Sequence, residues 1–256
     1  KGRPPNGQFV VYASALGNHF FTEIAELLAQ GLRDAGFTAA TRSEQDAQPT
    51  SGEWPIVVAP HEFFLLGAGR DLASAEWLGR AAVFNTEQMH TSWFSLSMPA
   101  LIRAGIVLSI DHETAQALRH TGANAHFLPL VLSHSGSDAE GLRGLRSWGP
   151  AVKAAGGAPD SPWAERPVDI AFIGTLFPRR ERFFAGSAER LAGYRSHLHL
   201  PKLRGPLQPQ GLDTLSAASA GAIARRTKVL LNIHQSEQAY FEWHRIVCLG
   251  MLNGAV

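Results

Sequence analysis

The sequence predicts an α/β protein of two Rossmann-like domains that face a cleft. Short apolar runs rich in β-branched residues alternate with helical patterns, and a stretch rich in Ser, Gly and Pro separates two such alternating regions. This alternation indicates parallel sheets that are covered by helices on both faces. The second region offers three strands with a fourth just beginning, so we expect the second domain to be incomplete in this chain.

The first domain is expected to span residues 1–132. It begins with a buried strand at Gln8–Ala13, after which apolar residues recur at helical spacing from Phe20 to Leu32 until Gly36 ends the helix. Four further strands are expected at Pro55–Pro60, Ala81–Glu87, Gly105–Ile110 and Ala125–Leu130, with helices around Met98–Ala104 and Glu113–Thr121.

A linker at residues 133–167, with a helix through Leu142–Val152, is expected to join the two domains. The second domain, residues 168–256, then restarts the alternation. The expected elements are a strand at Val168–Gly174, a helix that contains Phe183, Phe184, Leu191 and Tyr194, and strands at Ser196–Leu200 and Lys228–His234.

Composition excludes several classes of protein. Lys and Arg number 23 against 22 for Asp and Glu, so no basic surface for nucleic acid is indicated. Cys248 is the only cysteine, which rules out an intrachain disulfide framework and fits a reducing, cytoplasmic compartment. The apolar runs are shorter than the ~20 residues of a membrane span, so no transmembrane segment is expected. His197 and His199 alternate on one strand without further ligands, so we predict no metal site and no cofactor.

Two arginines follow the strand that ends at Gly174. Arg179 and Arg180 fall at the first turn of the next helix, where guanidinium groups and free helix N–H groups can bind a diphosphate. The alternative is that both are ordinary solvated residues beside Glu181. The spacing differs from a Walker loop.

A second polar cluster begins where the strand that ends at His234 leads into another helix. Glu237 and Glu242 lie near the start of that helix, and Arg245 shares a helical face with Glu242. Aromatic residues surround these charges, as in many sugar and base sites, and carboxylates there can accept sugar hydroxyls. The alternative is helix capping with a surface ion pair.

Histidine and carboxylate side chains also follow strands of the first domain. His19 lies on the first turn from strand to helix, where a neutral imidazole could take a proton from an acceptor hydroxyl. It could equally be a hydrogen-bonded structural residue. Glu87 and His90 follow a later strand in a similar position.

Four blocks of the chain resemble bacterial glycosyltransferases of the GT-B fold, in the group 1 or spore-maturation-protein-like branch. They are "NHFFTEIAELLAQGL", "FNTEQ" followed by "WF", "RPVDIAFIGTLFPRRERFF" and "VLLNIHQSEQAYFEWHRIVCLGMLNGAV". The resemblance implies transfer of a sugar from a nucleoside diphosphate sugar to a hydroxyl of a carbohydrate, lipid-linked or protein acceptor, without a metal. It implies a donor bound by the second domain and an acceptor bound by the first.

The resemblance also assigns residues. The donor element "G-R-x-x-x-x-K" is matched by Gly174 and Arg180, with Thr175 at its first basic position, and Leu249 stands at the second Glu of the "E-x7-E" pair, with Glu242 one residue from the first. We expect the donor to contact Gly174, Thr175, Arg179, Arg180, His234, Glu237, Glu242 and Arg245, the acceptor to contact Asn18, Glu87 and His90, and His19 to be the general base if the reaction inverts.

Two other functions remain open at this point. One is a non-catalytic protein that binds a sugar nucleotide or another small ligand with the same two-lobed fold, which the leucine at the second Glu position favours. The other is a two-domain isomerase of nucleotide sugars, which would share the architecture.

Overall fold

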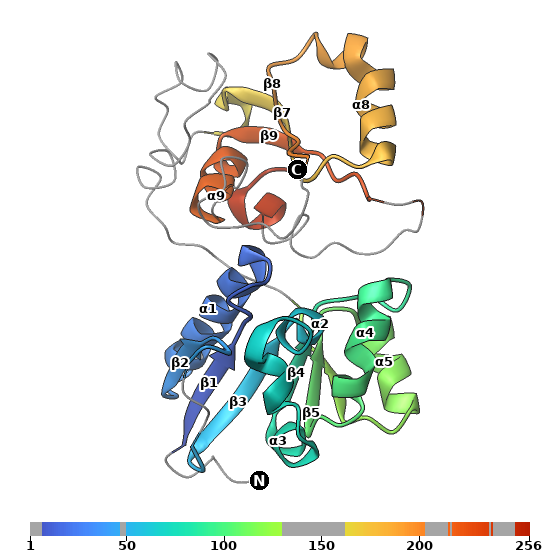
Figure 1. Cartoon of the computed structure of the whole chain (residues 1–256). Helices are drawn as coiled ribbons and strands as arrows, with labels where there is room; N and C mark the ends of the chain where they lie inside the picture. The colour runs from blue at the N-terminus through green and yellow to red at the C-terminus, as the bar shows by residue number, and fades with distance from the viewer. Residues whose placement is uncertain are drawn as a thin grey trace. The chain divides into compact units, whose positions relative to one another are not determined.

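The computed structural model describes residues 7–46, 50–129, 162–202, 215, 217–235, 237 and 249–256. The chain divides into two compact units. We call the described residues up to Pro129 unit 1 and those from Pro162 onward unit 2 (Figure 1). Each unit is an α/β structure with a parallel sheet, which confirms the predicted fold class at this level.

Unit 1 contains a parallel sheet of six strands in the order β2-β1-β3-β4-β5-β6. Because β2 lies on one side of β1 and β3 on the other, the direction of strand addition reverses between β1 and β3, which makes this the topological switch point. The strands are β1 (Gln8–Tyr12), β2 (Ala39–Arg42), β3 (Glu53–Val58), β4 (Ala82–Asn85), β5 (Ile106–Ser109) and β6 (Ala125–Phe127).

Several helices of unit 1 begin at polar caps. Asn18, Thr91 and Asp111 each accept a backbone N–H of the first helical turn through a side-chain oxygen, which stabilises the start of the helix. The helical elements are α1 (His19–Asp34), α2 (Pro60–Phe63), η1 (Gly67–Leu72), α3 (Ala75–Arg80), α4 (Ser92–Leu101) and α5 (His112–His120).

The core of unit 1 forms around the central strands. Val10, Val57, Val83 and Val107 occupy β1, β3, β4 and β5 and are fully buried. They share one apolar cluster with aromatic and leucine side chains of the helices. Continuous β-branched runs of this kind are typical of a parallel sheet that is buried on both faces.

The structure corrects several expected boundaries in unit 1. The predicted strand Pro55–Pro60 ends at Val58, and Pro60 is instead the first residue of α2, a position that proline favours because its missing N–H needs no partner there. The helix expected around Met98–Ala104 begins earlier, at the Thr91 cap. Strand β2 and helix α3 were not expected, since neither has a long periodic pattern.

Unit 2 contains a three-stranded parallel sheet in the order β8-β7-β9. Its core joins β7 and β9 to an alanine-rich helix, α9, whose Ala222, Ile223 and Ala224 are fully buried. The backbone of Val256 exchanges hydrogen bonds with Lys228 and Leu230, beside β9. The elements are η2 (Trp163–Glu165), β7 (Val168–Ile173), α8 (Pro178–Leu191), β8 (Ser196–His199), α9 (Ala217–Arg225), β9 (Thr227–Leu230) and η4 (Met251–Asn253).

Two expectations about unit 2 differ from the structure. Helix α9 was not predicted, and the strand expected at Lys228–His234 ends at Leu230, so that the residues from Leu231 to His234 form a connection without regular structure. The expected linker at 133–167 lies outside the described residues except for its last part, in which Trp163–Glu165 forms η2, and the expected helix at Leu142–Val152 lies wholly outside them. The proposed domain boundaries stay a prediction.

Candidate functional site

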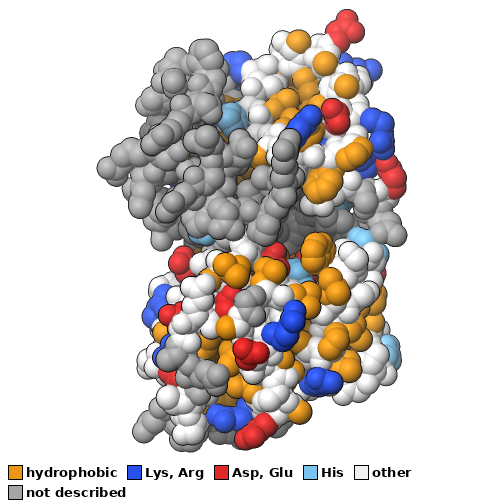
Figure 2. All heavy atoms as spheres, in the orientation of Figure 1, with side chains coloured by type: hydrophobic (Ala, Val, Ile, Leu, Met, Phe, Trp, Pro, Cys, Tyr) orange, Lys and Arg blue, Asp and Glu red, His pale blue; other side chains and the backbone are white. Residues whose placement is uncertain are grey.

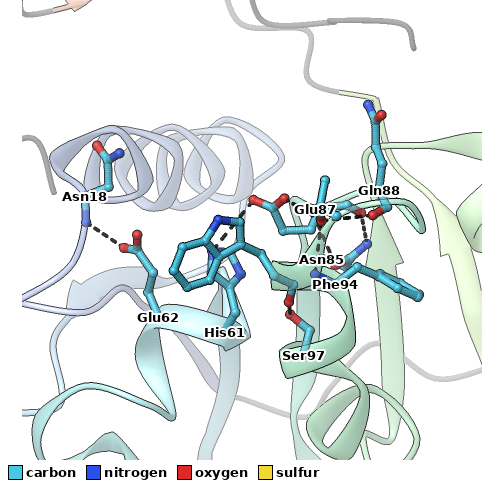
Figure 3. A network of polar contacts seen from close by, with 10 residues as sticks. Asn18, His61, Glu62, Asn85, Glu87, Gln88, Phe94 and Ser97 are labelled. Carbon is cyan, nitrogen blue, oxygen red and sulfur yellow. Dashed lines mark hydrogen bonds and ion pairs between the residues drawn. The ribbon is translucent and has the colours of Figure 1, made fainter. Parts of the chain in front are cut away.

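The polar groups of unit 1 gather at the carboxyl ends of its strands. The loop after β1 contains Asn18, the short helix α2 after β3 contains His61 and Glu62, and the loop after β4 contains Glu87 (Figure 3). Because β1, β3 and β4 are neighbours, these three connections meet beside the switch point of the sheet. Open α/β sheets bind ligands at this place.

Glu87 is held in a fixed position by residues on both sides. The buried Asn85 amide donates to the Glu87 carbonyl oxygen at 2.6 Å and accepts the Glu87 N–H through Oδ1 at 3.3 Å. The Thr91 hydroxyl lies 3.0 Å from Glu87 Oε2 and also caps α4. The carboxylate is therefore oriented before any ligand binds, as a reacting group requires.

Burial changes the acidity of Glu87. Its side chain is only 18% exposed, and burial raises the pKa of its carboxyl to about 7, with the Thr91 hydrogen bond acting in the opposite direction and the charge of Glu62 adding to the rise. A carboxyl with a pKa near 7 accepts and releases a proton at neutral pH.

His61 lies against Glu87 but is not its counter-ion. Its Nε2 is 3.7 Å from Glu87 Oε1, and its ring packs on Phe21 and Trp93 with centroids 5.5 and 5.6 Å away. The residue is 3% exposed, and burial lowers its pKa to about 4. The imidazole is thus neutral whenever Glu87 is ionised, so the contact is not an ion pair.

Glu62 contributes a second carboxylate to this edge. Its Oε2 accepts the N–H of Asn18 at 2.6 Å, and burial raises the pKa of its carboxyl while that hydrogen bond acts against the rise. A Cβ atom on Gly17 would clash with Glu62 Oε2, so the absence of a side chain at Gly17 allows the carboxylate to reach the loop after β1.

A third carboxylate fixes the same loop from the other side. Glu44, which follows β2, is buried and accepts hydrogen bonds from the Ser14 hydroxyl and the Ala15 N–H, both at 2.9 Å. The carboxyl edge of unit 1 near the switch point therefore presents mainly carboxylates, which disfavours phosphate binding there.

Three predicted residues of unit 1 have different surroundings. Asn18 contacts Glu62 through its backbone and caps α1 through its side chain. His19 is the first residue of α1, and its Nε2 lies 3.6 Å from Glu23 Oε1 one helical turn later. His90 is exposed on the loop after β4. Only Asn18 and Glu87 belong to the contact network of Figure 3.

Unit 2 brings its predicted donor residues together at the carboxyl ends of β7 and β9. Arg179 donates from Nε to Glu237 Oε2 at 3.1 Å and from Nη1 to the His234 carbonyl oxygen at 3.2 Å. Arg182 donates to the other oxygen of Glu237 at 3.2 Å. Because Arg179 is 33% exposed and Glu237 76% exposed, both remain accessible to a ligand.

Arg180, in contrast, lies fully buried below this edge. Its Nε donates to the Ile233 carbonyl oxygen and its Nη1 to that of Thr175, both at 2.8 Å, and its guanidinium lies over the Phe172 ring at 5.2 Å. Arg180 thus joins the loop after β7, which begins with Gly174, to the segment after β9. The diphosphate contact expected of Arg180 stays a prediction.

The last predicted block is described only in part. Glu242 and Arg245 lie outside the described residues. Leu249, at the position of the second Glu of the related motif, is buried in the apolar core of unit 2 with Val168 and Ala171. A carboxylate at this position would lie in that apolar core.

The described surface carries charges of both signs. Figure 2 shows Lys and Arg side chains beside Asp and Glu on the described surface, so neither sign dominates in that view. Within the described ranges, no helix is both long and apolar enough to cross a membrane, and no three His, Cys, Asp or Glu side chains group as metal ligands would.

Comparison of the chain with models of known protein families, with curated proteins and with solved structures finds no match. The function is therefore inferred from the geometry of the two strand edges.

Sequence reasoning missed His61 and Glu62. Both residues directly follow the expected strand Pro55–Pro60, and a position directly after a strand is the criterion that selected Glu87. The same criterion applied to "APHEF" would have found them. Their contact with Glu87 depends on the neighbouring positions of β3 and β4, which no local pattern reveals.

Proposed function

We propose that the protein transfers a sugar from a nucleoside diphosphate sugar to a hydroxyl acceptor, with Glu87 as the general base. The observation that carries this proposal is the oriented Glu87 carboxylate at the carboxyl edge of unit 1, whose pKa lies at about 7. In this proposal the donor is a substrate, and no cofactor takes part.

The basic edge of unit 2 supports the donor half of the proposal. Helix α8 begins without a side-chain cap, and its N-terminus and the guanidinium of Arg179 lie together after β7. Such a pair suits a diphosphate, because the helix dipole and the guanidinium both compensate negative charge. Glu237 keeps Arg179 in place until a phosphate competes for it.

In the proposed step, Glu87 takes the proton of the acceptor hydroxyl while the oxygen of that hydroxyl forms a bond to the anomeric carbon. The bond from that carbon to the diphosphate oxygen breaks, and its electron pair leaves with the nucleoside diphosphate, whose negative charge requires compensation by positive groups. Direct attack of this kind inverts the anomeric configuration. A positioned base contributes roughly 10²–10⁴-fold to such a rate.

The test is a panel of nucleoside diphosphate sugars, scored first by thermal shift and then by release of nucleoside diphosphate with a mixture of sugar and lipid-linked acceptors. We expect at least one donor to bind and turn over, and Glu87→Gln to lower turnover by roughly 10²–10⁴-fold with unchanged donor affinity. Full turnover in Glu87→Gln would remove Glu87 as the base.

His19 provides a matched comparison, because its position in the sequence predicts it as the general base. If Glu87 is the base, His19→Ala should retain turnover within a few-fold. A loss of 10²-fold or more in His19→Ala, with normal turnover in Glu87→Gln, would transfer the role to His19.

A second candidate is a non-catalytic protein that binds sugar nucleotides. The buried Leu249 favours it, since a core side chain replaces a carboxylate of the related motif. Donor binding without turnover on any acceptor in the panel would support this candidate over glycosyl transfer.

A further inference from the structure

The site around Glu87 presents hydrogen-bond acceptors and almost no donors. Glu62 and Glu87 are carboxylates, and no Lys or Arg among the described residues forms an ion pair or hydrogen bond with either. His61, which lies between them in Figure 3, is neutral and cannot compensate their charge. A ligand that fits this edge must supply the donors and the positive charge.

His61 provides an independent indication of a missing donor. The residue is 3% exposed, and its Nδ1 has no hydrogen-bond partner in the structure. When the neutral ring has its proton on Nε2, facing Glu87, Nδ1 is an acceptor. Buried acceptors are nearly always paired in native proteins, so an unpaired one beside two carboxylates points to a ligand with N–H groups.

Trp93 adds an aromatic surface next to this group. Its ring centroid is 5.6 Å from that of His61, yet the residue is 52% exposed. An exposed indole attracts a cation through the negative face of its ring. Ammonium groups are commonly bound by this combination of charge and aromatic surface.

We propose that the acceptor is an amino alcohol, such as an amino sugar, whose ammonium group binds Glu62 beside the indole of Trp93. Its neighbouring hydroxyl then faces Glu87. The Asn18 N–H occupies one oxygen of Glu62, which leaves Oε1 for the ammonium. The identification of this ligand as an acceptor rests on the proposed glycosyl transfer, whereas binding of the ammonium group does not.

The test measures binding of two probes of equal size, ethanolamine and ethylene glycol, to the full chain by ligand-observed NMR at pH 7.5 in a buffer without amines. We expect ethanolamine to bind at least about tenfold more tightly, which corresponds to about 1.4 kcal/mol. Glu62→Gln should remove the difference, while Gln still accepts the Asn18 N–H. Glu26→Gln, a change of an exposed carboxylate on α1, should preserve the difference.

Trp93→Leu is a second variant that keeps an apolar side chain on α4. It should weaken ethanolamine by about two- to fivefold without affecting ethylene glycol. Equal affinity of the parent for both probes would overturn the inference, and so would an undiminished difference in Glu62→Gln. Displacement of ethanolamine by submillimolar Mg²⁺ would overturn it in favour of a metal site.

The outcomes also separate this inference from the proposed function. Transfer to neutral sugars without ethanolamine binding would refute the amino alcohol and leave glycosyl transfer intact. Ethanolamine binding without any transfer would refute the transferase and leave the ammonium site intact.

Discussion

Removing the charge of Glu87 is expected to make unit 1 more stable at alkaline pH relative to the parent. In the parent, burial raises the carboxyl pKa from 4.5 to about 7. Folding therefore favours the protonated form, and the free energy of unfolding falls as pH rises from about 4.5 to about 7. At about 1.4 kcal/mol for each tenfold change, this loss is on the order of 3 kcal/mol, and it is absent in Glu87→Gln.

His61 changes stability in the opposite direction over nearly the same range. Burial lowers its pKa to about 4, so folding favours the neutral ring, and its contribution increases as pH rises from about 4 to about 6.5. The parent therefore shows a small net pH dependence from this pair. Because His61 is present in both proteins, the difference between Glu87→Gln and the parent isolates the carboxyl.

The measurement is a urea titration at pH 5 and pH 8, with hydrogen exchange read on peptides that cover β4, so that unit 1 is followed by itself. Glu87→Gln should gain on the order of 2–3 kcal/mol over the parent between the two pH values. Glu76→Gln, at an exposed carboxylate of α3, should gain nothing. An equal difference from the parent at both pH values would refute the reasoning that burial raises the pKa of Glu87.

Two further predictions concern single side chains. Gly17→Ala should destabilise unit 1 by about 0.5–1.5 kcal/mol in urea titrations, because its Cβ would displace the Glu62 carboxylate from the Asn18 N–H. Gly31→Ala, with open space on α1, should instead stabilise unit 1 by about 0.5–1 kcal/mol. Equal effects would contradict the close approach. Arg180→Met should destabilise unit 2 by about 3 kcal/mol, since two backbone carbonyls lose their buried donor. Arg179→Met should lower the stability by at most about 1 kcal/mol and should instead weaken nucleoside diphosphate binding, measured by calorimetry. The reverse order of stabilities would show that Arg180 is not the structural arginine.

The strands and helices with a clear hydrophobic pattern could be predicted from the local sequence. Gln8–Ala13 and Val168–Gly174 are continuous apolar runs, and the apolar spacing from Phe20 to Leu32 is that of an amphipathic helix, so these elements appear within one or two residues of their predicted limits. The short strand β2 and the alanine-rich helix α9 were not predicted, because a segment of four residues or a run of small side chains shows little hydrophobic periodicity.

The candidate site was predictable only in part. Glu87 was found because it follows a strand, and Arg179 because it follows another at the start of a helix, and both lie at the carboxyl ends of parallel strands in the structure. The sequence treated Arg179 and Arg180 alike. Their helical positions, one residue apart, turn one guanidinium toward solvent and bury the other beneath the loop, a difference that depends on packing against Phe172 and the segment after β9.

The sequence by itself determined that this is an α/β chain with polar residues after its strands, because hydrophobic periodicity and turn residues act over short distances along the chain. Tertiary structure alone decided which of those residues meet. The order of strands in the sheet brings helix α2, which follows β3, beside the loop after β4, so that His61, Glu62 and Glu87 form one group. Burial, which raises the pKa of Glu87 and lowers that of His61, is a property of the packed unit rather than of any segment.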